Sequence, residues 1–236
     1  MTTDTMRLTH AGAEFEAIVA RPQGPGPHPA VMVMHSALGL RHLVADKARA
    51  LAELGYLAIA TDMYGVGADT STPQAAGQHY MQYHDQPQLL RDRCVAWFDA
   101  IAARDDVDAA RIAAIGYCFG GRCTLELARS GADVKAAVSY HGILTTHAPA
   151  QPGAVKGEVS VWCGLKDPFA PLADIDALRA ELSAAGAHYH IAEFADAEHG
   201  FTDPEGEGGM PGIAYNAIAD RLSWAGTVAL LGIVLA

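Results

Sequence analysis

Basic residues are scarce in this sequence. Lysine and arginine together number 16 of 236 residues, against 27 aspartates and glutamates, and the formal net charge is −11. A phosphate-rich partner is repelled by this balance, so we expect no nucleic-acid binding. The longest apolar stretch at the C-terminus, residues 228–236, is far short of the roughly 20 residues that a membrane span needs. We therefore expect no membrane segment there, but the end of a helix packed on the core.

Cysteine is also rare, and its spacing favours reduced thiols over a disulfide framework. The four cysteines show no Cys-x-x-Cys pair, and residues 1–7 lack the apolar region of a signal peptide. We expect a cytoplasmic protein with reduced thiols. The four are Cys94, Cys118, Cys123 and Cys163.

Several cofactor motifs are missing as well. The eleven histidines include no His-Glu-x-x-His arrangement, no Gly-x-Gly-x-x-Gly follows an apolar run, and no Gly-Lys-[Ser/Thr] occurs. We therefore expect neither a metal ion nor a cofactor. The expected partner is a small molecule, and the protein is expected to be a monomer or a homodimer.

What the sequence does contain is an alternation of short apolar runs and helix-like segments. Half of the residues are hydrophobic, which suits a globular chain that buries a core. The alternation predicts a single α/β domain over residues 1–236, with a mostly parallel central sheet and helices on both faces. The expected strands, after a hairpin at 6–9 and 14–20, are 30–34, 57–61, 112–116, 136–139, 159–163 and 188–194. The expected helices are 43–54, 88–103, 119–129, 172–184 and 214–231, and 65–86 is expected to be a mobile cap.

A glycine-flanked cysteine carries the strongest chemical signal. The strand ending at Gly116 runs into Tyr117-Cys118-Phe119-Gly120 and then into a helical segment. Gly-x-nucleophile-x-Gly between a strand and a helix is the nucleophile elbow, in which larger residues at the two glycine positions would collide with backbone. A helix N-terminus also favours the thiolate of Cys118. Taken alone, the motif is compatible with a buried, inert cysteine.

An acid and a histidine follow in the order expected of α/β-hydrolases. Asp167 lies in the loop after the 159–163 strand, and His199 lies in the loop after the 188–194 strand. Carboxyl ends of parallel strands meet at one edge, so all three groups are expected together. Asp174 and Asp176 are rivals for the acid, but both lie on the following helix.

These motifs resemble the dienelactone hydrolase family, a cysteine branch of the α/β-hydrolases. The resemblance rests on Gly116–Gly121, Gly164-x-x-Asp167-Pro168 and His199-Gly200-Phe201, and it runs over nearly the whole chain. It implies an α/β-hydrolase fold, a Cys118–Asp167–His199 triad, and hydrolysis of lactones or other small carboxylic esters.

Two departures from the family pattern concern the substrate. The family carries a glutamate just after the first core strand, where this chain has Ser36, and an arginine for the substrate carboxylate shortly after the histidine, where Thr202-Asp203 follow Phe201. Asp203 is expected to repel an anionic substrate, so dienelactone itself is not expected as the substrate.

Further site residues are expected at the strand ends. The backbone N–H groups of Ala37 and Phe119 are the predicted oxyanion hole. Candidate substrate contacts, each equally compatible with packing, are His35, Ser36, Leu38, Tyr64, Tyr140 and His141.

Two other functions remain to be weighed. A class I glutamine amidotransferase also uses Gly-x-Cys-x-Gly, but it needs its acid two residues after the histidine, where this chain has Phe201. A non-catalytic binding module on a hydrolase scaffold is the alternative of a different class.

Overall fold

An eight-stranded sheet forms the centre of the protein in the computed structural model, which describes residues 3–205 and 210–236. The strand order is β1-β2-β4-β3-β5-β6-β7-β8. Strand β1 pairs antiparallel with β2, β2 pairs antiparallel with β4, and the pairs from β4 to β8 are all parallel. The expected mostly parallel sheet is thus confirmed. The strands are β1 (Thr3–His10), β2 (Ala13–Ala20), β3 (His28–Met34), β4 (Leu57–Thr61), β5 (Val107–Tyr117), β6 (Ala136–Tyr140), β7 (Glu158–Gly164) and β8 (Tyr189–Phe194).

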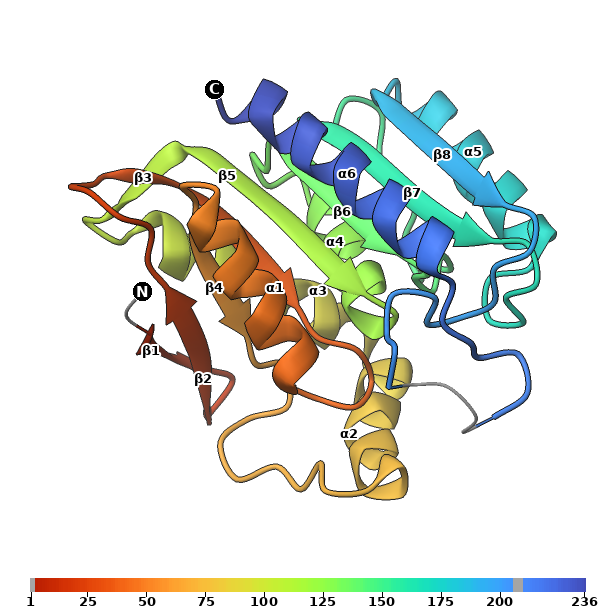
Figure 1. Cartoon of the computed structure of the whole chain (residues 1–236), viewed down its shortest axis with the longest axis horizontal. Coiled ribbons are helices and arrows are strands. Elements are labelled where there is room, and N and C mark those ends of the chain that lie inside the picture. Colours follow the sequence, from red (N-terminus) through yellow and green to blue (C-terminus); the bar gives the residue numbers. More distant parts are fainter. Residues whose placement is uncertain (1–2, 206–209) are drawn as a thin grey trace.

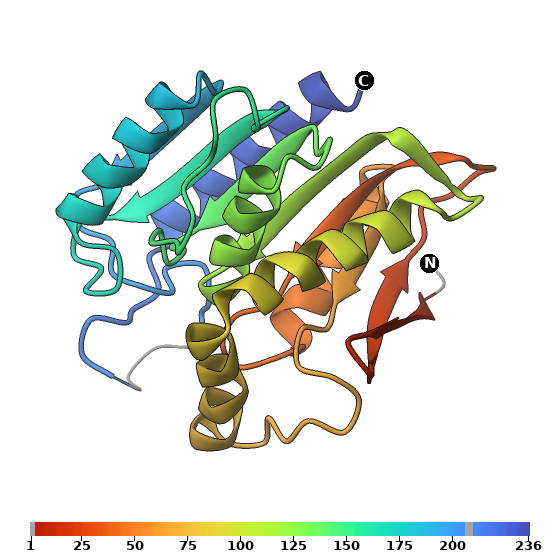
Figure 2. The same ribbon diagram turned by 180° about the vertical axis from the view of Figure 1, so that it is seen from behind.

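Helices cover both faces of this sheet, as predicted. Figure 1 shows α1 (His42–Glu53) and α6 (Ala217–Val234) in front of the sheet, and Figure 2 shows α3 (Pro87–Ala102), α4 (Phe119–Arg129) and α5 (Leu172–Ala184) on the opposite face. A further helix, α2 (Pro73–Asp85), stands beside the carboxyl ends of the strands.

The central strands are apolar on both sides because each face meets a helical layer. Along β3, Met32 and Met34 join the core under α3 and α4, whereas Val31 and Val33 join the core under α1. This explains why the AVMVM run shows no alternation of polar and apolar residues: neither face is left to water.

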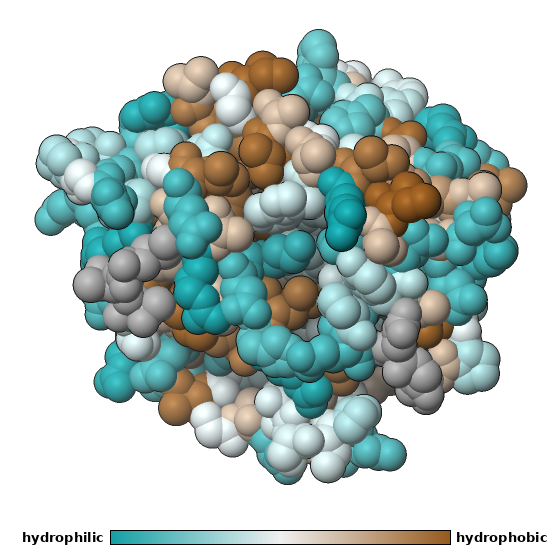
Figure 3. All heavy atoms as spheres, in the orientation of Figure 1, coloured by the Kyte–Doolittle hydropathy of each residue, from teal (hydrophilic) through white to brown (hydrophobic). Residues whose placement is uncertain are grey.

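Helix α6 begins three residues later than expected and also ends three residues later. Its start is fixed by Asn216, whose side-chain oxygen accepts hydrogen bonds from the N–H groups of Ile218 and Ala219. One face packs on β6 and β7, while the opposite face exposes Ile218 (71% exposed) and Ile233 (76%). Figure 3 shows apolar side chains over the region where α6 runs.

By length and composition α6 could also cross a membrane. The core helix of a globular protein passes the same test, and α6 places Ala219, Ser223, Thr227 and Leu231 against the sheet at helical spacing. This buried face is consistent with the expected final helix packed on the core.

The segment expected as a cap is only half loop. Residues 66–72 lack regular structure apart from turns and bends, but α2 follows them, with the Thr72 hydroxyl capping Ala75 N–H and Pro73 in the first turn. The sequence hides this helix because its apolar periodicity is weak and Gly77 lies within it. Its buried side rests on Tyr83, which stacks against Phe119 at 5.5 Å.

Candidate active site

Cys118 lies at the sharp turn between β5 and α4. Its backbone has φ 55° and ψ −111°, a conformation that side-chain-bearing residues rarely adopt. A Cβ at Gly116 would lie 2.0 Å from the Gly120 carbonyl oxygen, and one at Gly120 would lie 2.1 Å from that of Met34. No side chain fits either gap, so the collision expected from the sequence accounts for both glycines.

Asp167 and His199 meet at this edge of the sheet although 32 residues separate them. The Nδ1 atom of His199 is 2.8 Å from Oδ2 of Asp167, and both side chains are buried. The other carboxylate oxygen of Asp167 accepts a hydrogen bond from the N–H of Phe169 at 2.8 Å. Asp167 is thereby held by its own loop with one oxygen free for the imidazole.

The histidine loop is fixed by backbone pairing. His199 N–H donates to the carbonyl of Gly212 at 3.0 Å, and Ala214 N–H donates back to the His199 carbonyl at 3.1 Å. The ring also contacts Phe169 on one side and His141 on another, both edge to face. These contacts give the imidazole one orientation.

The sulfur of Cys118 and the ring of His199 are hydrogen-bonded to each other. Desolvation opposes ionisation of the thiol, but the neighbouring charge and hydrogen bond of His199 outweigh it and hold the pKa of Cys118 below its ordinary value. Desolvation likewise opposes the imidazolium, yet the Cys118 charge and the Asp167 hydrogen bond raise the pKa of His199 to about 10. Both shifts favour the thiolate and imidazolium forms of the pair over the neutral thiol and imidazole.

Two backbone N–H groups also point at the sulfur. They belong to Ala37 and Phe119, the residues that the sequence nominated, and both favour the thiolate. Phe119 begins α4, and Ala37 lies in the loop after β3. Two donors converging beside the Cys118 sulfur form the geometry that an oxyanion hole needs.

His35 supports this loop from below and does not contact the open site. Its ring is fully buried; Nε2 accepts a hydrogen bond from Met63 N–H at 3.0 Å, so Nδ1 carries the proton and donates to the Ser36 carbonyl at 2.7 Å. Burial lowers the pKa of His35, which keeps this neutral form. The Ser36 carbonyl and the Ala37 N–H belong to one peptide group, so His35 orients the N–H group that the sequence predicts as an oxyanion-hole donor.

Tyr64 and Ser36 lie near the sulfur as expected, but their polar atoms are occupied. The Tyr64 hydroxyl donates to the Ala37 carbonyl at 2.9 Å, and its ring stacks on Phe119 at 5.7 Å. The Ser36 hydroxyl accepts from Leu38 N–H at 3.3 Å. Both residues shape the loop that carries the Ala37 donor.

Tyr140 does not reach the site. It is buried on the side of the sheet that α6 covers, where its hydroxyl bonds to Thr227 and its ring stacks on Tyr117 at 4.8 Å. The sequence placed it correctly at a strand end, but the last residue of a strand can point to either face. The expectation of a substrate contact at Tyr140 is wrong for this reason.

Three residues near the site escaped the sequence reasoning. Phe169 contacts His199 at 4.8 Å, Tyr80 contacts Phe119 at 5.6 Å, and Arg122 lies one helical turn after Cys118. Only Arg122 had a signal in the sequence, because its spacing of four residues from the nucleophile places it in the first turn of the helix.

Metal ligands do not gather anywhere in the described part of the chain. Within residues 3–205 and 210–236, no group of three or more histidine, cysteine, aspartate or glutamate residues is arranged to hold an ion. The four cysteines are free thiols, and three of them are buried.

Comparison with known families gives a match over most of the sequence. The model of the dienelactone hydrolase family matches residues 15–235. A protein of Yersinia pestis named "Putative carboxymethylenebutenolidase" is 31% identical over 204 residues, which is 80% of this chain and 75% of that protein.

Solved structures agree with the sequence comparison. A structure titled m3DLH superposes with a TM-score of 0.93 at 33% identity, covering 100% of this chain and 99% of the other. The crystal structure of a dienelactone hydrolase-like promiscuous phosphotriesterase from metagenomic libraries gives a TM-score of 0.91 at 32% identity, with the same coverage.

Proposed function

Since this chain belongs to the dienelactone hydrolase family, we propose that it hydrolyses small carboxylic esters or lactones with Cys118 as the nucleophile. The observation that carries the proposal is the set of groups around one sulfur atom. An imidazole held by a carboxylate and two backbone N–H groups all converge on Cys118. Attack on an acyl carbon uses each of these groups.

The first half of the reaction forms a thioester. The Cys118 thiolate attacks the ester carbonyl carbon, and the carbonyl electron pair moves to oxygen, where the Ala37 and Phe119 N–H groups stabilise it. Collapse of this intermediate breaks the bond to the alkoxy oxygen, which takes the proton from the His199 imidazolium. Asp167 keeps the ring oriented and stabilises its cation until that transfer.

The second half restores the enzyme. Neutral His199 removes a proton from a water molecule, whose oxygen attacks the thioester carbon in the same oxyanion hole. Collapse releases the carboxylic acid and returns the sulfur as thiolate beside the imidazolium. For a lactone, the alcohol and the acid are parts of one product molecule.

The geometry also bears on the alternatives. Phe201, which stands where an amidotransferase needs its acid, is a buried aromatic residue, and Asp167 contacts His199 in its place. A non-catalytic binding module has no need for a thiol of lowered pKa beside a buried imidazole. Both observations favour the hydrolase.

A panel of neutral and anionic esters and lactones tests the proposal. The purified protein is assayed beside Cys118→Ala and His199→Ala, and both variants are expected to lose turnover while keeping the fold by circular dichroism. Electrospray mass spectrometry after rapid acid quenching should detect the acyl group on the peptide that contains Cys118. Hydrolysis that persists in Cys118→Ala contradicts the proposal.

Alkylation separates the hydrolase from the binding module. Iodoacetamide should modify Cys118 well below the pH at which a free thiol of pKa about 8.5 reacts. Cys163 is the matched internal control, because burial raises its pKa to about 12. Equal labelling of the two thiols would favour a non-catalytic protein.

A further inference from the structure

A cavity of about 370 Å³ adjoins the candidate active site. Phe169, which lines the cavity, packs edge to face on the ring of His199. Tyr80, which lines it too, packs edge to face on Phe119. A small molecule with its acyl carbon at Cys118 therefore has this cavity as its neighbour, and the wall of the cavity limits the size of the group that enters.

Much of that wall comes from the long connection between β6 and β7, residues 141–157, which contains neither a helix nor a strand. Within the described part of the chain, no backbone–backbone hydrogen bond involves residues 142–150. Buried polar backbone needs partners, so side chains from elsewhere must fix this part of the wall. The wall residues from this connection are Ile143, Thr145, Thr146 and His147.

Two side chains hold the ends of residues 144–150, which we call the wall segment. Arg129 donates to the Leu144 carbonyl at 2.9 Å, and Glu181 accepts from the Ala150 N–H at 2.8 Å. Neither Leu144 nor Ala150 lines the cavity. These two anchors fix where the wall segment begins and ends, but not the residues between them.

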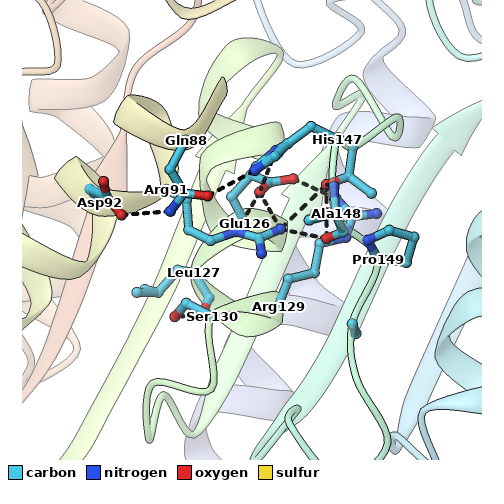
Figure 4. A network of polar contacts seen from close by, with 12 residues as sticks. Gln88, Arg91, Asp92, Glu126, Leu127, Arg129, Ser130, His147, Ala148 and Pro149 are labelled. Carbon is cyan, nitrogen blue, oxygen red and sulfur yellow. Dashed lines mark hydrogen bonds and ion pairs between the residues drawn. The ribbon is translucent and has the colours of Figure 1, made fainter. Parts of the chain in front are cut away.

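The middle of the wall segment is held by the beginning of α3. Nη2 of Arg91 donates to the Ala148 carbonyl at 2.6 Å and to the Thr146 hydroxyl at 3.4 Å. Gln88, one turn earlier on α3, accepts a hydrogen bond from Nε2 of His147 at 3.0 Å. Figure 4 shows Arg91 and Gln88 directed at this part of the chain. Because Thr146 and His147 line the cavity, α3 supports its wall from behind.

A buried carboxylate orients Arg91 for this contact. Oε2 of Glu126 accepts from Nε of Arg91 at 2.8 Å and lies 2.7 Å from Nη2, and the Glu126 side chain is 1% exposed. Two contacts to one oxygen fix the direction of the planar guanidinium. The other oxygen of Glu126 lies 3.1 Å from Arg129. Glu126 thus has a second cation beside it, and what Arg91 alone adds is the link to the wall segment.

We propose that Arg91 is a positioning residue for substrate selection: its hold on the middle of the wall segment sets the size of the ester group that the cavity accepts. This inference rests on the proposed hydrolase function. Arg91 acts through Thr146 and Ala148, since its polar contacts are with these two residues and with Glu126. A side chain on a helix behind the cavity thereby decides which esters fit in front of it.

Uncharged esters of increasing length test the proposal. One series varies the acyl group, from 4-nitrophenyl acetate to the octanoate, and the other varies the alcohol, from methyl to hexyl acetate. We expect the wild-type protein to discriminate against long groups in at least one series, because a methylene that a fixed pocket cannot accommodate costs roughly 10-fold or more in kcat/KM. In Arg91→Met the ratio of kcat/KM between the best and the longest ester should fall about 10-fold. A wild-type protein that does not discriminate overturns the proposal.

Arg91→Lys separates positioning from charge. Lysine keeps a cation beside Glu126 but lacks the planar fork that reaches the wall segment as well. We expect this variant to keep the melting temperature and still lose the discrimination. Arg104→Lys is the matched control: Arg104 holds the carboxylate of Asp106 at 2.8 and 2.9 Å, but it precedes the start of β5, whereas Cys118 follows its end. Discrimination that survives in Arg91→Lys, or that falls equally in Arg104→Lys, overturns the proposal.

Alkylation of Cys118 tests the wall without turnover. Iodoacetamide and its N-benzyl and N-octyl derivatives carry one reactive group with substituents of increasing size. The labelling rate should fall with size in the wild-type protein and fall about 10-fold less steeply in Arg91→Lys. An equal size dependence in the two proteins overturns the proposal. Failure of the wild type to hydrolyse any ester rejects the proposed function instead, and the alkylation series then still decides the role of Arg91.

Discussion

A buried arginine lies near each end of α4, and the two arginines differ in how many polar partners they have. At the end of the helix, Arg129 is 4% exposed and holds both oxygens of Glu181 at 2.8 Å, one oxygen of Glu126 and the Leu144 carbonyl. At the start, Arg122 is buried to a similar degree and has none of these partners. Figure 4 shows Arg129 directed at the Glu126 carboxylate.

The two arginines thus have different surroundings within eight residues of one helix. A buried charge that is fully paired fixes elements together: Arg129 joins α4 to α5 and to the loop at Leu144. A buried charge without a carboxylate partner lowers stability. Cys118 immediately precedes the start of the helix. The unpaired cation therefore lies in the turn that follows the proposed nucleophile.

The largest effect is expected when the charge that orients the proposed catalytic pair, Cys118 and His199, is removed. Asp167→Asn should lower kcat about 10⁴-fold, because an amide cannot stabilise the imidazolium or fix its tautomer. Since Asp167 raises the pKa of His199, its loss lowers that pKa, and the pKa of Cys118 then rises. Iodoacetamide labelling followed against pH should shift to higher pH, with the melting temperature little changed. A labelling profile that stays where it was contradicts the assigned pairing.

At the other end of α4, the expected effect is on stability. Arg129→Met leaves two carboxylates facing each other in a buried site and should cost about 3–5 kcal/mol of unfolding free energy, measured in urea. Specific activity per folded molecule should stay near that of the wild type. Arg122→Met is the matched control and should change stability far less, because no carboxylate loses a partner. Equal destabilisation by the two variants removes the contrast between the ends of the helix.

A somewhat smaller loss of activity is expected from a substitution at His35, which supports the loop that carries Ala37. His35→Phe removes the donor that holds the Ser36–Ala37 peptide, and ester hydrolysis should fall about 10²–10³-fold, the usual cost of one oxyanion-hole donor. His35→Asn restores a donor close to Nδ1 and should recover part of the rate. Alkylation by iodoacetamide above pH 9 needs no oxyanion hole and should stay nearly constant; a parallel loss in both assays contradicts the assigned role of His35.

The smallest effect is expected for Asp203, the charge that was expected from the sequence to repel anionic substrates. Asp203→Asn should change the anionic-to-neutral ratio of kcat/KM by less than about 3-fold, because charges outside a site are screened by solvent and salt. The measurement compares pairs of esters that differ only in one carboxylate, which is free in one member and methyl-capped in the other. A larger gain for anionic esters in Asp203→Asn restores the repulsion expected from the sequence.

Much of the fold was predictable because local signals and the layer arrangement agree. Helices 119–129 and 172–184 are found at the residues predicted, the first because the glycine turn fixes its start and Gly131 follows its end. The eight strands differ from expectation mainly in length; β5 begins at Val107 instead of residue 112 because it pairs with His28 before a shift in register. Helix α2 was missed because its contacts with the rest of the protein, not its own pattern, stabilise it.

The candidate site was predictable in its backbone and less so in its side chains. Strand ends meet at one edge of a parallel sheet, so the sequence order alone brings Cys118, Asp167 and His199 together. Which way a strand-end side chain points depends on the pleat, and this is why Tyr140 faces α6. The lack of a partner at Arg122 depends on what surrounds it from four separate segments, and no spacing rule contains that information.

The close approach of Gly120 to the Met34 carbonyl has a consequence for how this protein can change. It fixes the turn that carries Cys118 against the end of β3, backbone to backbone, so the position of the Phe119 N–H relative to β3 follows from main-chain geometry. Exchange of side chains that line the neighbouring cavity of about 370 Å³, such as Thr145 and Thr146, is expected to alter which molecules enter without moving that turn. The position of the turn and the choice of substrate therefore depend on different residues. Substitutions in the wall of the cavity can admit new substrates while the turn itself stays fixed.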